Sequence, residues 1–303
     1  MTADTHSQLP SFICVGGAKC GTTSLYEYLR SHPEVFLTEQ KELHYFSYPD
    51  LEKRPEGPGM RAVLKGLIST EDQYRAQFSS MKPGAVAGDI SPSYLNEEHA
   101  PERIEALLGK DVKIIILLRD PVERVISQYM HLRRAAREAL PLKDALAEEP
   151  NRIDKNWGDM WHYRASAYAA DRVERYINRF GAENVLVVLS DDLRTHPKET
   201  VQDICRFIGV SADYHFDTGQ EFNRSGLPKS RFVARLVDAS PLANMAKAIL
   251  PRRLGAIIKR KLQEMNTGEK EAISETLRAQ LKQDYANEIV RLEEILGRKT
   301  GWQ

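Results

Sequence analysis

Short apolar segments alternate with helix-like segments along the first two thirds of the chain. Residues 12–15, 85–90, 112–118 and 184–189 are apolar and predict strands, and 112–118 includes three consecutive isoleucines. The segments between them carry apolar residues at helical spacing and predict helices over 22–30, 101–108, 121 to about 138, and 163–180. Residues 49–59, rich in Pro and Gly, predict a loop. This alternation is typical of an α/β fold with helices on both faces of a parallel sheet and a ligand crevice at the carboxyl ends of the strands.

The length of 303 residues is compatible with a single α/β domain, and we expect one domain over residues 1–303. Its core is expected at about 11–235. A polar loop follows residue 209, and helices are expected over 236–303. Within that part, residues 246–261 are amphipathic and basic. They fit either a solvated helix face or a surface that meets a membrane.

Charge and cysteine content narrow the function classes. Lys and Arg together number 43, as do Asp and Glu, so no global field favours nucleic acid, and any anion site is expected to be local. Residues 1–10 are polar and the longest apolar run is short, so neither secretion nor a membrane span is expected. Three cysteines without CxxC spacing predict reduced thiols, a cytoplasmic location and no metal site. The oligomeric state stays open, and a homodimer is one compatible state.

The turn after the first predicted strand carries candidate chemistry. Residues 16–21 read Gly-Gly-Ala-Lys-Cys-Gly, and Thr22, Thr23 and Ser24 begin the next helix. Backbone N–H groups and a helix N-terminus in such a turn bind phosphate or sulfate. Lys19 adds a full positive charge. The sequence therefore predicts an anion site formed by residues 19–24, whose members are Lys19, Cys20, Gly21, Thr22, Thr23 and Ser24.

This turn differs from the loop of nucleotide kinases. The kinase pattern GxxxxGK[ST] has Lys after the last glycine, where this chain has Thr22. The strand over 112–118 runs into Arg119 before Asp120, so it does not end in a magnesium-holding Asp. We therefore expect anion binding without a metal. A phosphoryl transferase and a catalytically silent nucleotide-binding module are the competing interpretations.

Two motifs resemble those of sulfotransferases that use 3′-phosphoadenosine 5′-phosphosulfate (PAPS). Residues 15–25 resemble the family's 5′-phosphosulfate loop, and residues 115–129 resemble its 3′-phosphate motif, in which a strand-end Arg and a later Ser contact that phosphate. The corresponding residues are Arg119 and Ser127. The chain resembles the bacterial type of this family and is similar to heparan sulfate and Golgi-type carbohydrate sulfotransferase domains. The resemblance implies a P-loop nucleotide-kinase-like sheet and transfer of sulfonate from PAPS to a hydroxyl or amine, with adenosine 3′,5′-bisphosphate as product.

A third segment, over residues 222–231, lies where related enzymes carry a basic loop above the 3′-phosphate. The resemblance implies donor-binding roles for Asn223, Lys229, Ser230 and Arg231. The pattern is looser than in the family, so a surface loop is the alternative.

The acceptor side is indicated by residues 41–46, which resemble the Lys-Glu-x-His-Phe-Phe segment of heparan sulfate sulfotransferases. The resemblance implies that Glu42 is the base, with His44 nearby and Lys19 at the leaving phosphate. In a strand-like segment Glu42 and His44 would point to the same side. The family's following Asp is replaced here by Ser47 or Tyr48.

Asp89, at the end of another predicted strand, is a second candidate acid–base group or a turn residue. The acceptor itself stays open among glycans, lipids, polyketides and small phenols.

Overall fold

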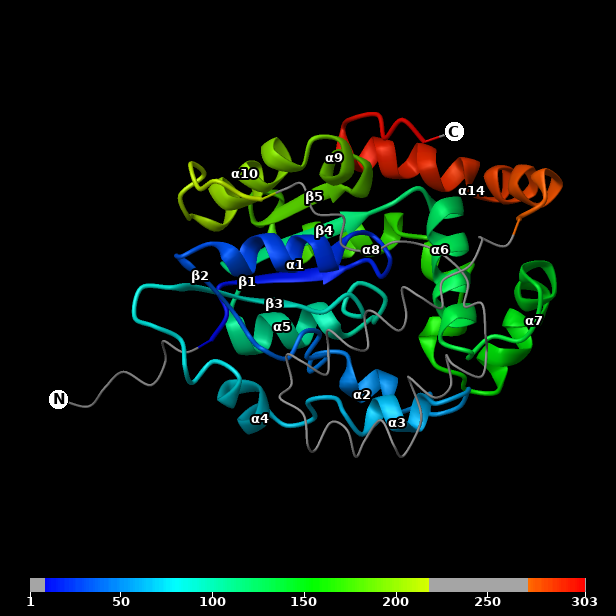
Figure 1. Ribbon diagram of the computed structural model, residues 1–303, viewed down its shortest axis with the longest axis horizontal. Coiled ribbons are helices and arrows are strands. Elements are labelled where there is room, and N and C mark those ends of the chain that lie inside the picture. The colour runs from blue at the N-terminus through cyan, green and yellow to red at the C-terminus, as the bar shows by residue number, and fades with distance from the viewer. Residues whose placement is uncertain (1–8, 218–271, 303) are drawn as a thin grey trace.

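The computed structural model describes residues 9–217 and 272–302. Five parallel strands form one sheet in the order β2-β3-β1-β4-β5 (Figure 1). The predicted α/β fold with a parallel central sheet is confirmed. The strands are β1 (Phe12–Gly16), β2 (Val35–Leu37), β3 (Val86–Ile90), β4 (Lys113–Leu118) and β5 (Val185–Leu189).

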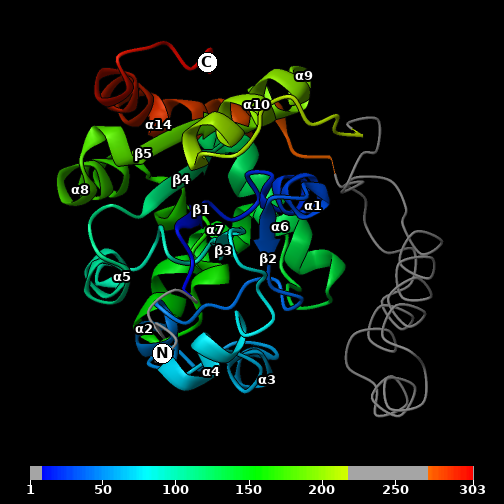
Figure 2. The ribbon, with the colours of Figure 1, turned by 90° about the vertical axis from the view of Figure 1, so that its left-hand side faces the viewer.

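Helices cover both faces of the sheet, as Figure 2 shows. Alternate residues of β4 point to opposite faces: Ile114 and Ile116 join one apolar cluster, whereas Ile115 and Leu117 join another. The first cluster includes residues from helices α5 (Ala100–Leu108) and α8 (Ala170–Phe180). The second includes residues from helices α1 (Thr22–Ser31) and α10 (Pro197–Ile208). Burial on both faces explains the unbroken apolar run of β4.

A further group of helices lies at the carboxyl end of β4. Helix α6 (Pro121–Arg134) begins there, and the Asp120 side chain caps it by accepting from the Glu123 backbone N–H at 3.0 Å. Helix α7 (Leu142–Asp154) and the C-terminal helix α14 (Glu275–Leu296) contribute to the same apolar cluster as α6. The expected helical C-terminal part is therefore present in α14.

Two predicted helices were too long. The helix expected over residues 163–180 begins at Ala170, and a 3₁₀ turn, η3 (Ala165–Ala167), precedes it. The Glu149 carboxylate accepts the backbone N–H groups of Arg164 and Ala165 at 2.8 and 2.9 Å, which removes them from any helical ladder. The helix expected to reach 138 ends at Arg134, because the chain turns through a positive φ of 54° at Ala136.

Several short elements were not predicted from the sequence. The segment 49–59, expected as a loop, contributes to helix α2 (Tyr48–Leu51), which carries Pro49 in its first turn. The remaining elements are α3 (Met60–Leu64), α4 (Glu71–Ala76), η2 (Asp159–Trp161), η4 (Ala182–Asn184) and α9 (Ser190–Thr195). The predicted donor segment over 222–231 and the basic segment over 246–261 lie outside the described residues.

Candidate active site

The strand order places three strand ends side by side. β1 lies between β3 and β4. The turn after β1, the segment after β3 and Arg119 after β4 therefore meet at the carboxyl end of the sheet. The segment after β3 stays bonded to β1, because the backbone N–H of Ser91 donates to Cys14 O at 3.0 Å and that of Leu95 to Val15 O at 2.8 Å. This end of the sheet carries the candidate residues that follow all three strands.

The glycine-rich turn is held tightly against the sheet. The Gly17 N–H donates to Leu117 O at 2.5 Å, and a Cβ at Gly16 would lie 2.6 Å from Pro92 O. Gly21 precedes α1 with a φ of 101°, and within the described residues no side chain caps this helix. The N–H groups of its first turn, at Thr22, Thr23 and Ser24, therefore have no cap from that residue and are available to bind an anion.

Lys19 lies in this turn among other cations. Burial and the positive charge of Arg134 lower the pKa of Lys19 to about 8, and Arg119 and Lys41 add to that effect while Glu42 opposes it. The Arg119 guanidinium also donates to the Lys19 carbonyl at 3.3 Å. So much positive charge at one place indicates a site for an anion.

Arg119 and Ser127 are the two candidate residues of the motif at residues 115–129. Arg119 directly follows β4 and keeps 32% of its side chain exposed. Ser127 is half-buried two turns into α6, the helix that follows Arg119. Within the described residues, the ion pair of Arg119 is a loose one of 3.7 Å to Glu123, which leaves guanidinium donors for a further anion.

Glu42 and His44 lie together, but the expected strand is absent. Both residues have positive φ values, 64° and 57°, and the segment between β2 and α2 is irregular. Leu43 and Phe46 are buried in the apolar core beneath, so Glu42 and His44 remain at the surface of the site, with 35% and 17% of their side chains exposed. The two residues are adjacent because their neighbours are anchored, not because of strand alternation.

The Glu42 carboxylate is ionised in this setting. It pairs with the Lys41 ammonium, and its Oε2 lies 3.7 Å from Nε2 of His44. Burial alone would raise the pKa of Glu42, but the contact with His44 and the charge of Lys41 lower it to about 2.

Asp89 is turned away from solvent, with 1% of the residue exposed. Its carboxylate accepts hydroxyl hydrogen bonds from Ser91 at 2.6 Å, Tyr94 at 2.7 Å and Tyr74 at 3.3 Å. Burial raises the pKa of Asp89, and these bonds offset part of that effect. Of the two candidate carboxylates, Glu42 alone reaches solvent, whereas Asp89 lies under the site as a support.

His131 of α6 belongs to the site, although the sequence analysis did not single it out. Although the residue is exposed at the surface, desolvation by the surrounding protein and the positive charges of Lys19 and Arg134 lower the pKa of His131 below its usual value. His131 lies four residues after Ser127, on the same side of the helix, and that spacing was the available signal.

Two further observations concern only the described residues. Nowhere in 9–217 or 272–302 is there a helix that has the length and apolar content to cross a membrane. The same ranges contain no group of three or more His, Cys, Asp or Glu side chains placed to hold a metal ion. The donor candidates Asn223, Lys229, Ser230 and Arg231 fall outside these ranges.

Comparisons with known proteins agree with this arrangement. Residues 9–225 match the family model of the sulfotransferase domain. A crystal structure of a sulfotransferase from Alicyclobacillus acidocaldarius is 32% identical, with a TM-score of 0.75 over 96% of this chain and 97% of that one. Heparan sulfate glucosamine 3-O-sulfotransferase 3B1 of Homo sapiens is 31% identical over 216 residues, which cover 69% of this chain and 49% of that protein.

A more distant relative is the bifunctional heparan sulfate N-deacetylase/N-sulfotransferase 1 of Mus musculus. It is 26% identical over 254 residues, which cover 80% of this chain and 26% of that protein. The matched regions thus span half or less of the length of these two curated relatives. The family model and the Alicyclobacillus structure both extend over most of the chain, and the chain therefore belongs to the sulfotransferase domain family.

Proposed function

We propose that the protein transfers a sulfonate group from PAPS to a hydroxyl or amine of an acceptor. The observation that carries the proposal is the uncapped first turn of α1, with Lys19 beside it and Arg119 on the neighbouring strand end. These groups offer backbone N–H donors and two cations to a ligand that bears anions at two places.

The donor fits these residues through its two anionic ends. The turn at residues 19–24 would bind the 5′-phosphosulfate through its N–H groups, the Lys19 ammonium and the hydroxyls of Thr22, Thr23 and Ser24. Arg119 and Ser127 would bind the 3′-phosphate. Asn223, Lys229, Ser230 and Arg231 stay proposed donor contacts on the family resemblance.

The reaction is an in-line displacement at sulfur. The acceptor oxygen or nitrogen forms a bond to sulfur while the bond from sulfur to the phosphate oxygen breaks, and Lys19 stabilises the charge on that oxygen. The acceptor proton goes to Glu42, and adenosine 3′,5′-bisphosphate leaves. In the free protein Lys41 and His44 make Glu42 a weak base. When the donor binds near Lys19 and Lys41, its negative charges offset the positive charges of these two lysines. The pKa of Glu42 then rises, which makes Glu42 a stronger base.

The acceptor class is proposed from the relatives. The names of two relatives specify heparan sulfate, so we place glycans first among the acceptors to test, before lipids, polyketides and phenols. A transfer assay with ³⁵S-labelled PAPS and a panel of these acceptors tests the proposal. Label in an acceptor, with an equal amount of adenosine 3′,5′-bisphosphate released, is the expected result. Phosphate transfer from ATP, with PAPS left intact across the panel, would contradict it.

Transfer is expected to be independent of divalent metal. The turn has Thr22 where the kinase loop has Lys, and β4 is followed directly by Arg119, not by a magnesium-holding Asp. PAPS also lacks the β- and γ-phosphates that Mg²⁺ bridges. Initial rates measured with EDTA and with added Mg²⁺ should agree within about twofold. Activity that chelation abolishes and Mg²⁺ restores would contradict this prediction.

A further inference from the structure

His44 is held on two sides by the segment that follows β3. Its backbone N–H donates to the Ser91 hydroxyl at 3.2 Å, and its ring Nδ1 lies 2.6 Å from the Ser93 hydroxyl. Ser91 in turn donates to Asp89 at 2.6 Å. One segment therefore fixes both the backbone and the ring of a residue that adjoins Glu42.

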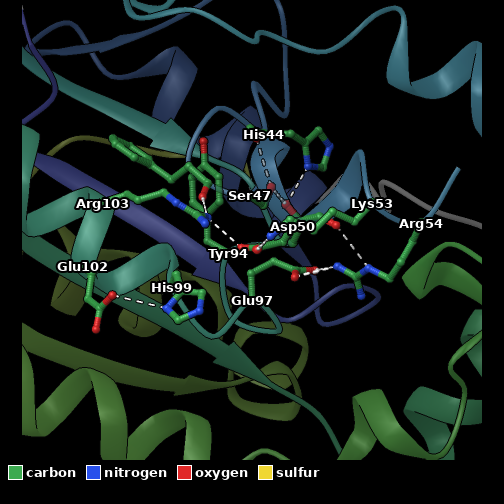
Figure 3. A network of polar contacts seen from close by, with 12 residues as sticks. His44, Ser47, Asp50, Lys53, Arg54, Tyr94, Glu97, His99, Glu102 and Arg103 are labelled. Atoms are coloured by element: carbon green, nitrogen blue, oxygen red, sulfur yellow. Dashed lines mark hydrogen bonds and ion pairs between the residues drawn. The ribbon is translucent and has the colours of Figure 1, made fainter. Parts of the chain in front are cut away.

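Behind Ser93 lies a second buried hydroxyl. The Ser47 and Ser93 oxygens are 2.6 Å apart, and these residues are 0% and 6% exposed. Figure 3 shows Ser47 close to His44, at the start of the short helix that carries Asp50. Ion pairs of Asp50 with Arg103 and of Arg54 with Glu97 hold this part of the chain in place. Because both hydroxyls are closed off from solvent, their protons must go to protein acceptors.

The direction of these hydrogen bonds follows from the other hydrogen bonds that each atom makes. Ser47 can donate to Ser93 or to the His44 carbonyl, which lies 3.0 Å away. That carbonyl already accepts backbone N–H bonds from Ser47 at 3.1 Å and Tyr48 at 2.8 Å. Ser47 therefore donates its hydroxyl hydrogen bond to Ser93, and Ser93 donates its own to Nδ1 of His44. With Nδ1 as an acceptor, a neutral ring carries its proton on Nε2.

Nε2 is the ring atom that faces Glu42, at 3.7 Å from Oε2. A proton there attracts the ionised carboxylate, whereas a lone pair there would repel it. We infer that Ser93, backed by Ser47, is a positioning residue that holds His44 with its Nε2–H toward Glu42. This inference rests on the proposed function for its effect on turnover, but not for the ring geometry itself.

The ring geometry is tested by ¹⁵N NMR of the histidine side chains in the full chain at alkaline pH, where an imidazole is neutral. His44→Gln assigns the signals. We expect Nδ1 of His44 to show the shift of an unprotonated nitrogen and Nε2 that of a protonated one. Ser93→Ala should move the Nδ1 signal, and Ser166→Ala, which removes another buried serine hydroxyl, should not. A protonated Nδ1, or an Nδ1 signal that ignores Ser93→Ala, overturns the inference. This test needs no turnover, so it is separate from any failure of the proposed reaction.

Turnover supplies the second arm. Ser93→Ala should lower kcat about tenfold, the effect of one lost buried hydrogen bond, with unchanged affinity for adenosine 3′,5′-bisphosphate. Ser93→Thr, which keeps a hydroxyl, should recover part of the loss. In a His44→Ala background, Ser93→Ala should have no further effect, because Ser93 acts through the ring. Equal losses of kcat in both backgrounds would overturn the inference.

Discussion

Glu42→Gln is expected to lower kcat by on the order of 10²- to 10⁴-fold, the usual contribution of a positioned general base. Glutamine keeps the shape of the side chain but cannot take the acceptor proton. The affinity for adenosine 3′,5′-bisphosphate should stay within a few fold, because Glu42 is proposed to act on the acceptor. Steady-state kinetics with saturating PAPS, together with calorimetry of nucleotide binding, measure the two effects separately.

Asp89→Asn is the matched control, because it makes the same chemical change in the buried carboxylate. Ser91, Tyr94 and Tyr74 all donate hydrogen bonds to Asp89. The NH₂ group of an asparagine is itself a donor, so it cannot accept the hydrogen bonds of these hydroxyls. The variant should lose about 1–3 kcal/mol of unfolding free energy. Its loss of kcat should be smaller than that of Glu42→Gln. If Asp89→Asn gave the larger loss in folded protein while Glu42→Gln stayed near wild type, the roles of the two carboxylates would have to be exchanged.

Lys19→Ala is expected to damage both binding and turnover, each by on the order of 10²-fold, because the ammonium is proposed to contact the phosphosulfate in the ground state and the leaving oxygen in the transition state. Lys19→Arg keeps the charge and should be less impaired in binding than Lys19→Ala. Calorimetry and single-turnover rates give the two effects. A Lys19→Ala variant that binds nucleotide and turns over like wild type would remove Lys19 from the site.

Lys19 is also expected to set an upper pH limit for nucleotide binding. Its pKa in the free protein is about 8, so the charged form that is proposed to bind the donor is lost as the pH rises through that value. Nucleotide affinity should fall above about pH 8, and binding at that pH should take up protons from the buffer. Lys19→Arg should bind without this dependence, because its guanidinium stays charged. A pH-independent affinity of the wild type between pH 7 and 10 would contradict the assignment.

Much of the sheet could be predicted from the sequence, because its strands carry their own signal. The apolar run of β4 is buried on both faces, and the glycine-rich turn needs both its positive φ values and its close approach to Pro92. β2 was missed because it has only three residues at the edge of the sheet. The start of α8 was misplaced because the competing partner of its preceding N–H groups, Glu149, belongs to another helix.

The candidate site was predicted less completely than the fold. Local motifs indicated Lys19, Glu42 and Arg119, whose neighbours in sequence supply the signal. Ser93 comes from a separate segment, and its hydrogen bond to His44 spans 49 positions, which no local pattern reveals. Asp89 is buried because Tyr74 and Tyr94 pack around it. These contacts cannot be predicted from the local sequence, so the burial of Asp89 became evident only in the structure.

The use of PAPS is tested most directly by calorimetry of adenosine 3′,5′-bisphosphate against 5′-AMP on the full chain. The two ligands differ only in the 3′-phosphate, which Arg119 and Ser127 are proposed to bind. A charge-assisted contact of this kind contributes about 2–3 kcal/mol, so the bisphosphate should bind roughly 30- to 150-fold more tightly. Arg119→Ala should remove most of that difference. Equal affinity of the wild-type protein for the two nucleotides would contradict the account.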